Sequence, residues 1–508
     1  MPHSPLSGRF VRALRLAALP PGCDPSAPPA LAGAGRLPSR REALRAGGVA
    51  IAGLAAARCA SVVPAAGAPG GSSEVLVVGG GLAGLTAAWR LKQAGVSVRL
   101  VEADERVGGR VRSLAGRFPE GLVAELGAER IDGGDERLRA LAGDLSLELD
   151  DLLVEPPGVD ETVFVGGALR REAELVEAMR PVVAAARRDL AAIGGAAGAG
   201  RLGPETARAL DLLPVPEWLA RHGVAGWART FVEVVLEAER GLGVGEQSCL
   251  ELVLAAGGGA DHPRPFGEAG GSFRVRGGND RLATRLAEEL DGALGLGTRL
   301  EALRKGSDGR LLASLRRDGT SRVERADRVV LALPFPLLRE VRLDVPLSPA
   351  KRGAIAGLDH GTSSKLVTAW SRRAWRLAHG SNGTVVADTG TGVVRETSRG
   401  QKGSAGLLSS VAGGARGMAA GQGTPAERAA ELAGLLDRLF PGMSAHHRPS
   451  EAVRFHWPAH PFARGGVACY RVGQVTAFGG AEGEREGEVF FAGEQTAGRF
   501  RGTMEGAC

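Results

Sequence analysis

The segment from Glu74 to Arg110 constrains the fold more than any other part of this sequence. It contains an apolar run, Glu74–Val78, followed by Gly79, Gly81 and Gly84 in the spacing GxGxxG. This pattern predicts a strand, a glycine turn and then a helix. Gly79 permits the tight turn, Gly81 lets backbone approach a pyrophosphate, and Gly84 lets helix and strand pack closely. The phosphates would then meet unpaired N–H groups at the positive end of the helix.

The second half of the segment strengthens the prediction of a dinucleotide site. Ser97–Val101 is a second apolar run, and Glu102 follows it, where a carboxylate can accept hydrogen bonds from a ribose diol. Between the two runs, apolar residues recur at helical spacing. A glycine-rich βαβ unit that binds nothing is the alternative. The fingerprint does not choose between NAD and FAD.

Length and charge narrow the class of protein. At 508 residues the chain exceeds the size at which one core keeps growing, so two domains are expected. The net charge of +6 comes from the first 70 residues, which hold eight arginines and two acidic residues. Removing these from the totals of 63 basic and 57 acidic residues leaves 55 of each sign. Because the chain after residue 70 has no net charge, its charge gives a nucleic-acid-binding role little support.

Residues 1–73 form a leader outside the predicted fold. Arg40-Arg41 precede a weakly apolar segment, Ala46–Ala57, and small residues follow, which resembles a twin-arginine export signal with cleavage near Ala66 or Ala68. We therefore expect the twin-arginine machinery as a partner and export to the periplasm. An ordinary Arg/Ala-rich leader is the alternative, and the protein then stays in the cytoplasm. The sparse cysteines argue against a disulfide framework.

Two further patches, together with the fingerprint, carry a family resemblance. Arg106-Val107-Gly108-Gly109-Arg110 adds a second glycine turn, and Glu125–Ile131 reads ELGAERI. With these patches the chain resembles the flavin-containing amine oxidases, which include monoamine, polyamine and L-amino-acid oxidases. The resemblance implies that Arg106, Gly109, Arg110, Gly127 and Ala128 lie at the flavin. No metal is implied.

The resemblance also implies the fold class and the domains. The expected fold is α/β, a Rossmann-type FAD-binding domain interrupted by an α+β substrate domain. Residues 74–145, 263–340 and 465–508 are assigned to the FAD-binding domain, and residues 146–262 and 341–464 to the substrate domain. Helical patterns occur at Leu138–Leu147, Arg171–Ile193, Ala207–Leu212 and Ala426–Phe440. Leu294–Ala313 and Arg322–Pro334 are predicted to be strands.

The C-terminal part of the chain favours FAD over NAD. Glu488–Glu494 is an apolar strand closed by Gly493 and Glu494, and it resembles the family element whose acid meets the ribityl chain. Gly502–Ala507 resembles the GYMEGA element, in which Met504 begins a helix facing the flavin. Pro334, after Leu331-Ala332-Leu333, corresponds to another close approach to the flavin.

Three residues are candidates for the reaction itself. Lys365, in a segment expected to lead into a strand ending near Trp375, matches the family lysine that contacts flavin N5 through a water. Arg130 lies where the family's amino-acid oxidases place an arginine for the substrate carboxylate, which a guanidinium grips with two hydrogen bonds. The alternative is a surface ion pair of Arg130 with Glu129, which replaces the family's Met, or a salt bridge within the flavin domain. Trp457 is a possible pocket wall or a core residue.

Other positions depart from the family pattern. The two tyrosines that cage the amine in monoamine oxidases correspond to Ala468 and Thr503, and the single tyrosine of the chain is Tyr470. Turnover of simple amines is therefore in doubt. Val467 replaces the cysteine that attaches flavin covalently, so non-covalent FAD is expected, although Cys469 is nearby.

We therefore expect an FAD-dependent oxidase that converts an amine or an L-amino acid to an imine and reduces dioxygen to hydrogen peroxide. A desaturase or dehydrogenase of carbon–carbon bonds is the alternative with the same fold. A flavin-binding homologue without turnover is the alternative from another class.

Overall fold

The computed structural model describes Leu14, Ala17 and residues 74–153, 158–193, 205–257, 271–390 and 392–508. Leu14 and Ala17 are helical and buried within an apolar cluster of the helical region. Apart from these two residues, the expected leader and its twin-arginine motif lie outside the described residues. No helix of the described chain is long and apolar enough to cross a membrane.

A parallel five-stranded sheet forms the centre of the first region. Its strands, in spatial order, are β10 (Leu294–Gly295), β2 (Ser97–Val101), β1 (Glu74–Val78), β14 (Arg328–Leu331) and β23 (Val489–Phe491). Helix α3 (Leu82–Gln93) follows β1 directly. These strands come from all three segments assigned to the FAD-binding domain, whose limits stay a prediction. The α/β fold of Rossmann type is confirmed.

The strands of this sheet are apolar throughout because both faces are covered. Val75 and Val77 belong to a core cluster with α3, α4 (Glu136–Asp144) and α10 (Arg281–Glu289). The alternate residues, Leu76 and Val78, belong to a second cluster on the other face. A side-chain period of two therefore places successive residues of one strand in two different cores.

The second cluster packs on a four-stranded sheet that the sequence predicted only in part. The strands are β11 (Arg299–Lys305), β12 (Leu311–Arg317), β13 (Thr320–Ala326) and β15 (Arg342–Asp344). The expectation of strands over Leu294–Ala313 and Arg322–Pro334 was wrong in extent. Turns with positive φ at Gly297 and Gly309 interrupt the first range, and Asp327 separates β13 from β14 in the second. Asp318 and Gly319 both have positive φ, 49° and 78°, in the two-residue turn between β12 and β13.

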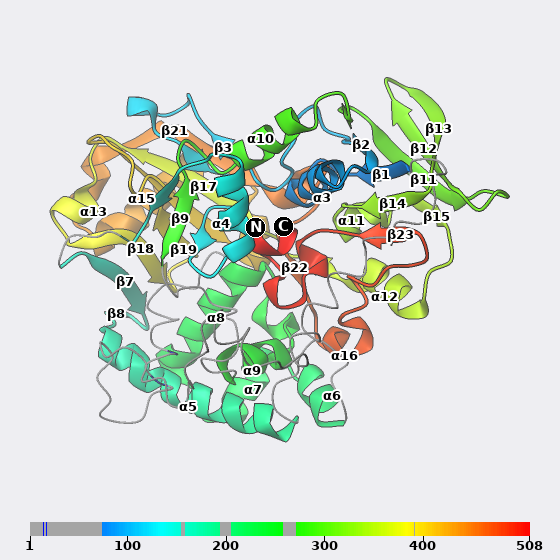
Figure 1. Cartoon of the computed structure of the whole chain (residues 1–508). Helices are drawn as coiled ribbons and strands as arrows, with labels where there is room; N and C mark the ends of the chain where they lie inside the picture. Colours follow the sequence, from blue (N-terminus) through cyan, green and yellow to red (C-terminus); the bar gives the residue numbers. More distant parts are fainter. Residues whose placement is uncertain are drawn as a thin grey trace, which may run out of the picture. The chain divides into compact units, whose positions relative to one another are not determined.

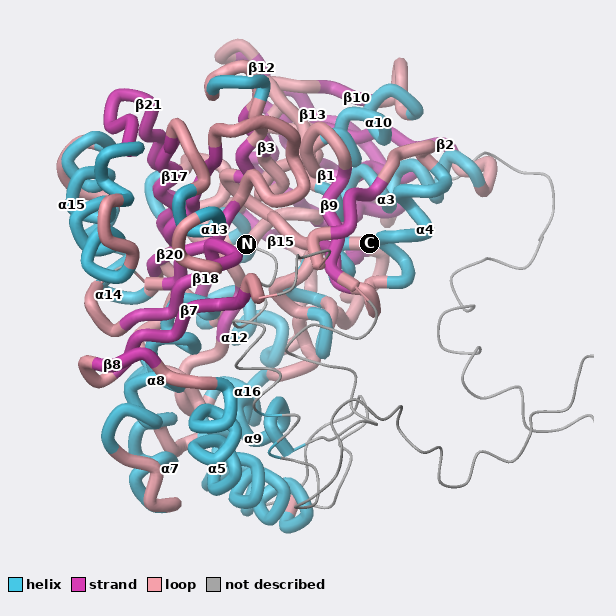
Figure 2. Tube along the Cα trace, turned by 90° about the vertical axis from the view of Figure 1, so that its left-hand side faces the viewer, coloured by secondary structure: helices cyan, strands magenta, loops and turns pink. Residues whose placement is uncertain are grey.

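A seven-stranded sheet forms the centre of the second region (Figure 2). Its order is β21 (His447–His456), β17 (Ser364–Trp370), β20 (Gly406–Ala412), β19 (Val393–Glu396), β18 (Ser381–Ala387), β7 (Asp160–Val165) and β8 (Ala168–Leu169). The expected strand end near Trp375 was wrong. Strand β17 ends at Trp370, and Trp375 lies on α13 (Ala374–Leu377), where its indole N–H donates to the buried Glu396 carboxylate at 3.0 Å.

Helices cover both faces of this sheet. On one face, α15 (Pro425–Leu439) shares a core with Leu366, Val385 and Val394. On the other face, Val386 and Val393 pack on the helical region, where α8 (Gly226–Arg240) runs against the strands. Figure 1 shows the helices of this region gathered together. They are α5 (Glu172–Ala192), α6 (Glu205–Asp211), α7 (Val215–Arg221), α8 and α9 (Cys249–Gly257).

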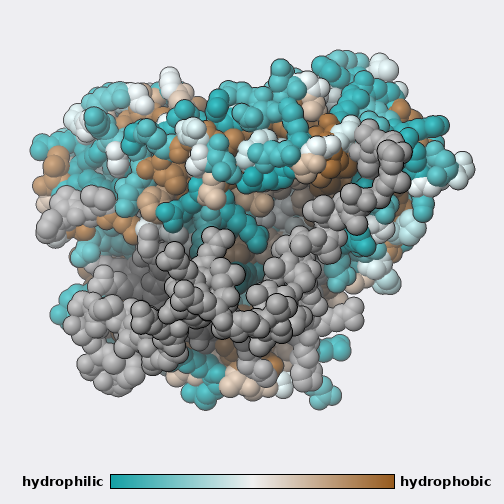
Figure 3. All heavy atoms as spheres, viewed as in Figure 1, coloured by the Kyte–Doolittle hydropathy of each residue, from teal (hydrophilic) through white to brown (hydrophobic). Residues whose placement is uncertain are grey.

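Short elements connect the sheets. The strands among them are β3 (Ser113–Leu114), β4 (Ala124–Glu125), β5 (Ile131–Asp132), β6 (Leu149–Asp151), β9 (Ser272–Val275), β16 (Asp359–His360) and β22 (Ala468–Cys469). The helices are α11 (Phe335–Leu338), α12 (Pro349–Gly357), α14 (Gly414–Ala420) and α16 (Gln474–Phe478). Hydrophilic residues predominate among the coloured residues on the face shown in Figure 3, and hydrophobic ones form small separate areas.

Candidate active site

The glycine turn after β1 has the geometry that its spacing predicts. Gly79 has a φ of +108°, which disfavours any side chain. A Cβ at Gly84 would lie 1.9 Å from the Gly79 carbonyl oxygen, so only glycine fits between turn and helix. A Cβ at Gly81 would meet no protein atom within 4 Å, and Gly81 lines a pocket. The turn therefore leaves the space in front of α3 open for a ligand.

The acid at the end of β2 faces the same space. One Glu102 oxygen accepts the Gly80 N–H at 2.5 Å, and the other accepts the Asp104 N–H at 2.7 Å. Burial raises the pKa of this carboxyl. Each carboxylate oxygen has a second acceptor position, so Glu102 retains capacity for a ribose hydroxyl.

One pocket runs from this glycine turn to the C-terminal segment. The pocket holds about 910 Å³ of space outside the protein atoms, a volume that includes open solvent at its mouth. Eleven of the thirteen residues predicted to bind the cofactor line it: Gly79, Gly81, Glu102, Arg106, Gly109, Arg110, Ala128, Pro334, Gly493, Glu494 and Met504. The other two, Gly84 and Gly127, pack behind it, and a Cβ at Gly127 would lie 1.9 Å from the Arg110 carbonyl oxygen.

An ion pair joins the second glycine turn to the C-terminal segment. Arg110 Nη1 lies 2.5 Å from Glu494 Oε1 and also donates to the Gly466 carbonyl oxygen at 2.7 Å. Glu494 additionally accepts the N–H groups of Ala468 and Gly502. Burial alone would raise the pKa of Glu494, but Arg110 outweighs burial and holds it at about 2. Segments far apart in the sequence are thereby fixed against each other at the pocket.

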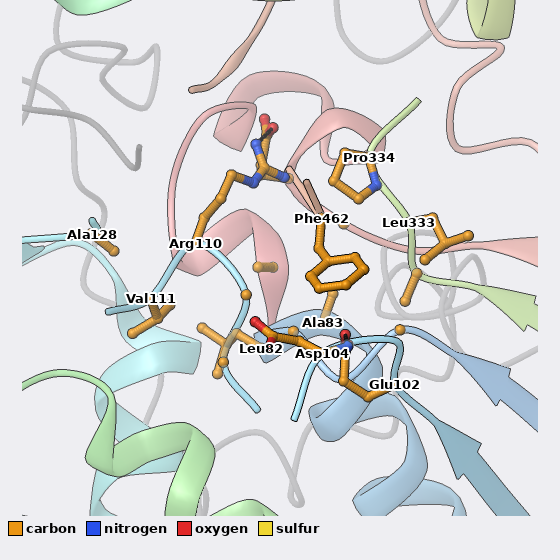
Figure 4. Close-up of a pocket in the computed structure, with 18 of the residues that line it drawn as sticks. Leu82, Ala83, Glu102, Asp104, Arg110, Val111, Ala128, Leu333, Pro334 and Phe462 are labelled. Carbon is orange, nitrogen blue, oxygen red and sulfur yellow. Dashed lines mark hydrogen bonds and ion pairs between the residues drawn. The ribbon is translucent and has the colours of Figure 1, made fainter. Parts of the chain in front are cut away.

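Several pocket residues were missed by the sequence analysis, most clearly His460 and Phe462. Figure 4 shows the Phe462 ring between Pro334 and Arg110 on one side and Glu102 with Asp104 on the other. Phe462 and His460 continue a line of aromatic contacts that includes Trp457. A signal was present in the sequence: three aromatic residues occur in 455–462 of a chain with 4% aromatic residues.

Lys365 lies on β17, and its side chain contacts the segment Glu125–Glu129, which carries Ala128. Its ammonium donates to the carbonyl oxygens of Glu125 and Gly127, at 2.8 and 3.3 Å, and to Glu129 Oε2 at 2.6 Å. These three contacts use all three donor protons of an ammonium. Lys365 is 1% exposed and does not line the pocket itself.

Glu129 is the partner that the sequence analysis did not assign to Lys365. Burial raises the pKa of its carboxyl, but the Lys365 ammonium outweighs burial and leaves the pKa below its ordinary value. The sequence held one signal for this pairing, because Glu129 stands where the resembling family has Met.

Arg130 and Trp457 also lie outside the pocket wall. Arg130 Nε donates to Ser272 Oγ at 2.6 Å, and its guanidinium repels that of Arg395. Trp457 is fully buried, donates to the Leu126 carbonyl oxygen at 3.1 Å and packs against Gly127. Trp457 therefore supports the segment below the pocket, while the substrate-binding role of Arg130 stays a prediction.

No tyrosine of the described chain lines the pocket. Tyr470 is buried and donates to Glu482 at 2.7 Å. Thr503 does line the pocket, and its hydroxyl donates to the Phe500 carbonyl oxygen. Cys469 is buried in β22, and burial raises the pKa of its thiol to about 12.

The pocket fits FAD at the positions expected for its pyrophosphate and its ribose. Within the described chain, no side chain caps the start of α3, and its first turn has no acidic residue. The uncapped backbone N–H groups at the start of α3 and the open space at Gly81 suit a pyrophosphate, and the Glu102 carboxylate suits a ribose diol. A dinucleotide held there extends toward Arg110, Glu494 and Met504.

Comparison with known proteins agrees with this geometry. The sequence model of the family described as flavin containing amine oxidoreductase matches residues 82–508. An L-amino acid dehydrogenase of Synechocystis sp. is 24% identical over 453 residues, 87% of this chain and 93% of that protein. Among solved structures, cyclohexylamine oxidase from Brevibacterium oxydans matches with a TM-score of 0.74 at 23% identity, over 86% of this chain and 96% of that chain. Putrescine oxidase bound to putrescine matches with a TM-score of 0.73 at 23% identity, over 86% and 97%.

Proposed function

Because this chain belongs to the flavin-containing amine oxidoreductase family, and is therefore an FAD-dependent oxidoreductase of carbon–nitrogen bonds, we propose that it is an oxidase of amines or L-amino acids. The products are the imine and hydrogen peroxide, with dioxygen as the final electron acceptor. The observation that carries this proposal is the pocket that runs from the glycine turn at Gly81 to the C-terminal residues Thr503 and Met504. FAD bound there supplies the acceptor for a hydride equivalent from the carbon next to nitrogen.

The residues of the protein bind the cofactor and exclude water from the pocket. Gly79, Gly81 and Glu102 hold the nucleotide, while Arg110 and Glu494 fix the two walls at the other end. The half-buried Phe462 lines the pocket, and the fully buried Trp457 supports the segment below it, so both limit the access of water to the flavin. The carbon–nitrogen bond is oxidised without a side-chain nucleophile or a metal. Val467 and the buried Cys469 support non-covalent attachment of FAD.

A second candidate uses an electron acceptor other than dioxygen. The observation that favours it is the engagement of all three Lys365 donors, which leaves none for a water beside the flavin. The Glu129 carboxylate also offsets the positive charge that would assist reduction of dioxygen. The L-amino acid dehydrogenase among the relatives has a name consistent with this alternative.

The test is a screen of amines and L-amino acids against the purified, FAD-loaded protein. A peroxide-coupled assay in air reports the oxidase, and a dye acceptor without dioxygen reports the dehydrogenase. Peroxide formed in proportion to imine supports the proposal. Dye reduction with no peroxide supports the second candidate instead. Flavin that no amine or amino acid reduces would contradict both.

Export through the twin-arginine machinery to the periplasm also stays a proposal, supported by Arg40-Arg41 and the segment after them. Replacing both arginines with lysine should retain the protein in the cytoplasm, and fractionation of cells would measure this. Unchanged export of the variant would contradict the proposal.

A further inference from the structure

His460 lines the pocket but is not one of the residues predicted to bind the cofactor. It follows the short helix η4 (Trp457–Ala459), and its side chain is half-buried. The imidazole packs against the rings of Trp457 and Phe455, with ring centroids 5.5 and 5.6 Å apart. These aromatic contacts hold the imidazole at the wall of the pocket.

One nitrogen of the His460 ring is fixed as an acceptor. The N–H of Phe462 donates to His460 Nδ1 at 3.3 Å. Burial lowers the pKa of His460, and Arg112 and Arg106 lower it further, although Asp104 acts in the opposite direction. The ring is therefore neutral at pH 7. A neutral imidazole that accepts a hydrogen bond at Nδ1 carries its proton on Nε2, so the second nitrogen is a donor.

This Nε2–H donor has no acceptor among the described residues. The hydrogen bond from Phe462 to Nδ1 is the one that the imidazole makes within the described chain. The Lys365 ammonium differs, because its three donors all have protein acceptors. Donors that are removed from bulk water normally bind protein, ordered water or a ligand. Since His460 lines the pocket, a ligand in the pocket can accept this hydrogen bond.

The wall around His460 carries more positive than negative charge. Arg106 and Arg112 act on the imidazole electrostatically, against Asp104 alone among the acidic residues. Arg106 lines the pocket and donates to two backbone carbonyl oxygens of the second glycine turn, at 3.1 and 2.9 Å. Arg112 lies over the Phe455 ring at 5.0 Å, and no carboxylate of the described chain pairs with it. Such a wall suits an anionic ligand.

His460 belongs to the nucleotide end of the pocket. Its neighbours Asp104 and Arg106 follow shortly after β2, and both line the pocket. A backbone bridge joins Gly81 to Gly108, in the turn that Arg106 begins. The start of α3, which suits a pyrophosphate, is therefore next to the wall that carries His460.

We propose that His460 is a further cofactor-binding residue, whose Nε2–H donates to an oxygen of the FAD diphosphate. The backbone N–H groups at the start of α3 and the His460 ring then bind the same anion from two distant segments of the chain. A neutral donor suits this position, because Arg106 and Arg112 would repel a protonated imidazole. This inference rests on the binding of FAD and is independent of the substrate and of the electron acceptor.

The experiment measures the affinity of ADP, which carries the same diphosphate, for the full chain freed of FAD, by calorimetry. His460→Asn keeps an acceptor for the Phe462 N–H but has no donor at the position of Nε2. It should weaken ADP binding by about tenfold, because a hydrogen bond to a charged group is lost. His460→Gln places an amide N–H near the position of Nε2 and should retain most of the affinity. His379→Asn is the matched control, because His379 is also half-buried against an aromatic ring but does not line the pocket.

A role in the local turn alone gives the opposite order. His460→Gln would then weaken ADP binding, because the Phe462 N–H loses its acceptor, and His460→Asn would bind ADP as the unaltered protein does. That order would overturn the proposal. An equal loss in both variants would overturn it as well, since a donor at Nε2 would then not determine the affinity.

A second measurement covers a chain that does not stay folded without FAD. The fluorescence of released flavin reports how fast the FAD-loaded protein loses its cofactor. Release should be about tenfold faster from His460→Asn than from His460→Gln, and His379→Asn should match the unaltered protein. Equal rates of release from the two His460 variants would overturn the proposal.

These binding measurements need no substrate, so their result is separate from that of the proposed function. ADP binding that depends on the donor at His460, in a protein that oxidises no carbon–nitrogen bond, would support the cofactor contact and contradict the proposed function alone. Oxidation of amines or amino acids, together with unchanged ADP affinity in His460→Asn, would contradict the cofactor contact alone.

Discussion

The two ends of the pocket are built in different ways. The nucleotide end comes from one continuous stretch, Glu74–Arg110, and consists mainly of backbone and glycine. The opposite end combines Arg110, Pro334 and the C-terminal segment, and buried ion pairs lie behind it. The shape of the nucleotide end is therefore encoded by one short segment, whereas the pairing of buried charges at the opposite end needs residues from several segments.

The largest expected effect separates the two glycines of the nucleotide end. Gly84→Ala should prevent folding, because its Cβ would lie 1.9 Å from a backbone oxygen. Gly81→Ala should fold normally, because its Cβ meets no protein atom, but it should weaken FAD binding by about tenfold or more. Circular dichroism and flavin absorbance after gel filtration measure folding and binding. Unchanged FAD retention in Gly81→Ala would place the pyrophosphate elsewhere.

The next effect tests the charge balance at the other end. Lys365→Met should lower the free energy of unfolding by about 3–5 kcal/mol, because Glu129 would remain buried without its partner. Lys365→Met combined with Glu129→Met should regain most of this loss. Urea unfolding of the two variants and the unaltered protein measures the difference. Equal loss in the single and double variants would show that the ion pair is not what the lysine provides.

A somewhat smaller effect concerns Glu125, below the same segment. Burial raises the pKa of its carboxyl from 4.5 to about 7, so the folded protein binds a proton that the unfolded chain has released. This contribution to stability is therefore lost as the pH rises from about 4.5 to 7, by at most about 3 kcal/mol. Glu125→Gln should reduce that loss, as measured by urea unfolding at pH 5 and pH 8. Glu289→Gln, an exposed control, should leave the pH dependence unchanged.

The last substitution, at Cys469, is expected to have no effect on the binding of FAD. Cys469→Ala should retain FAD as the unaltered protein does, and acid precipitation should release all flavin from both. The reason is that the buried thiol stays protonated at neutral pH and does not line the pocket. Flavin remaining in the precipitate of the unaltered protein, but not of Cys469→Ala, would identify a covalent link.

Local patterns predicted much of the fold correctly. The fingerprint strands, α3, α5 and α15 occur close to where periodicity places them. The errors occurred where turns or tertiary contacts override a local pattern. Turns at Gly297 and Gly309 interrupt the first range that was predicted to be a strand. Trp375 lies beyond the end of β17, on α13, where it donates to Glu396.

Taken by itself, the sequence determined the nucleotide end of the pocket, because the glycines and Glu102 act within one βαβ unit. It also indicated both walls of the flavin end through Arg110 and Glu494. Only the tertiary structure decided that Glu129 holds Lys365 and that His460 lines the pocket near Arg106. The physical reason is that the energy of a buried charge depends on every neighbour within a few ångströms, and those neighbours come from distant parts of the chain.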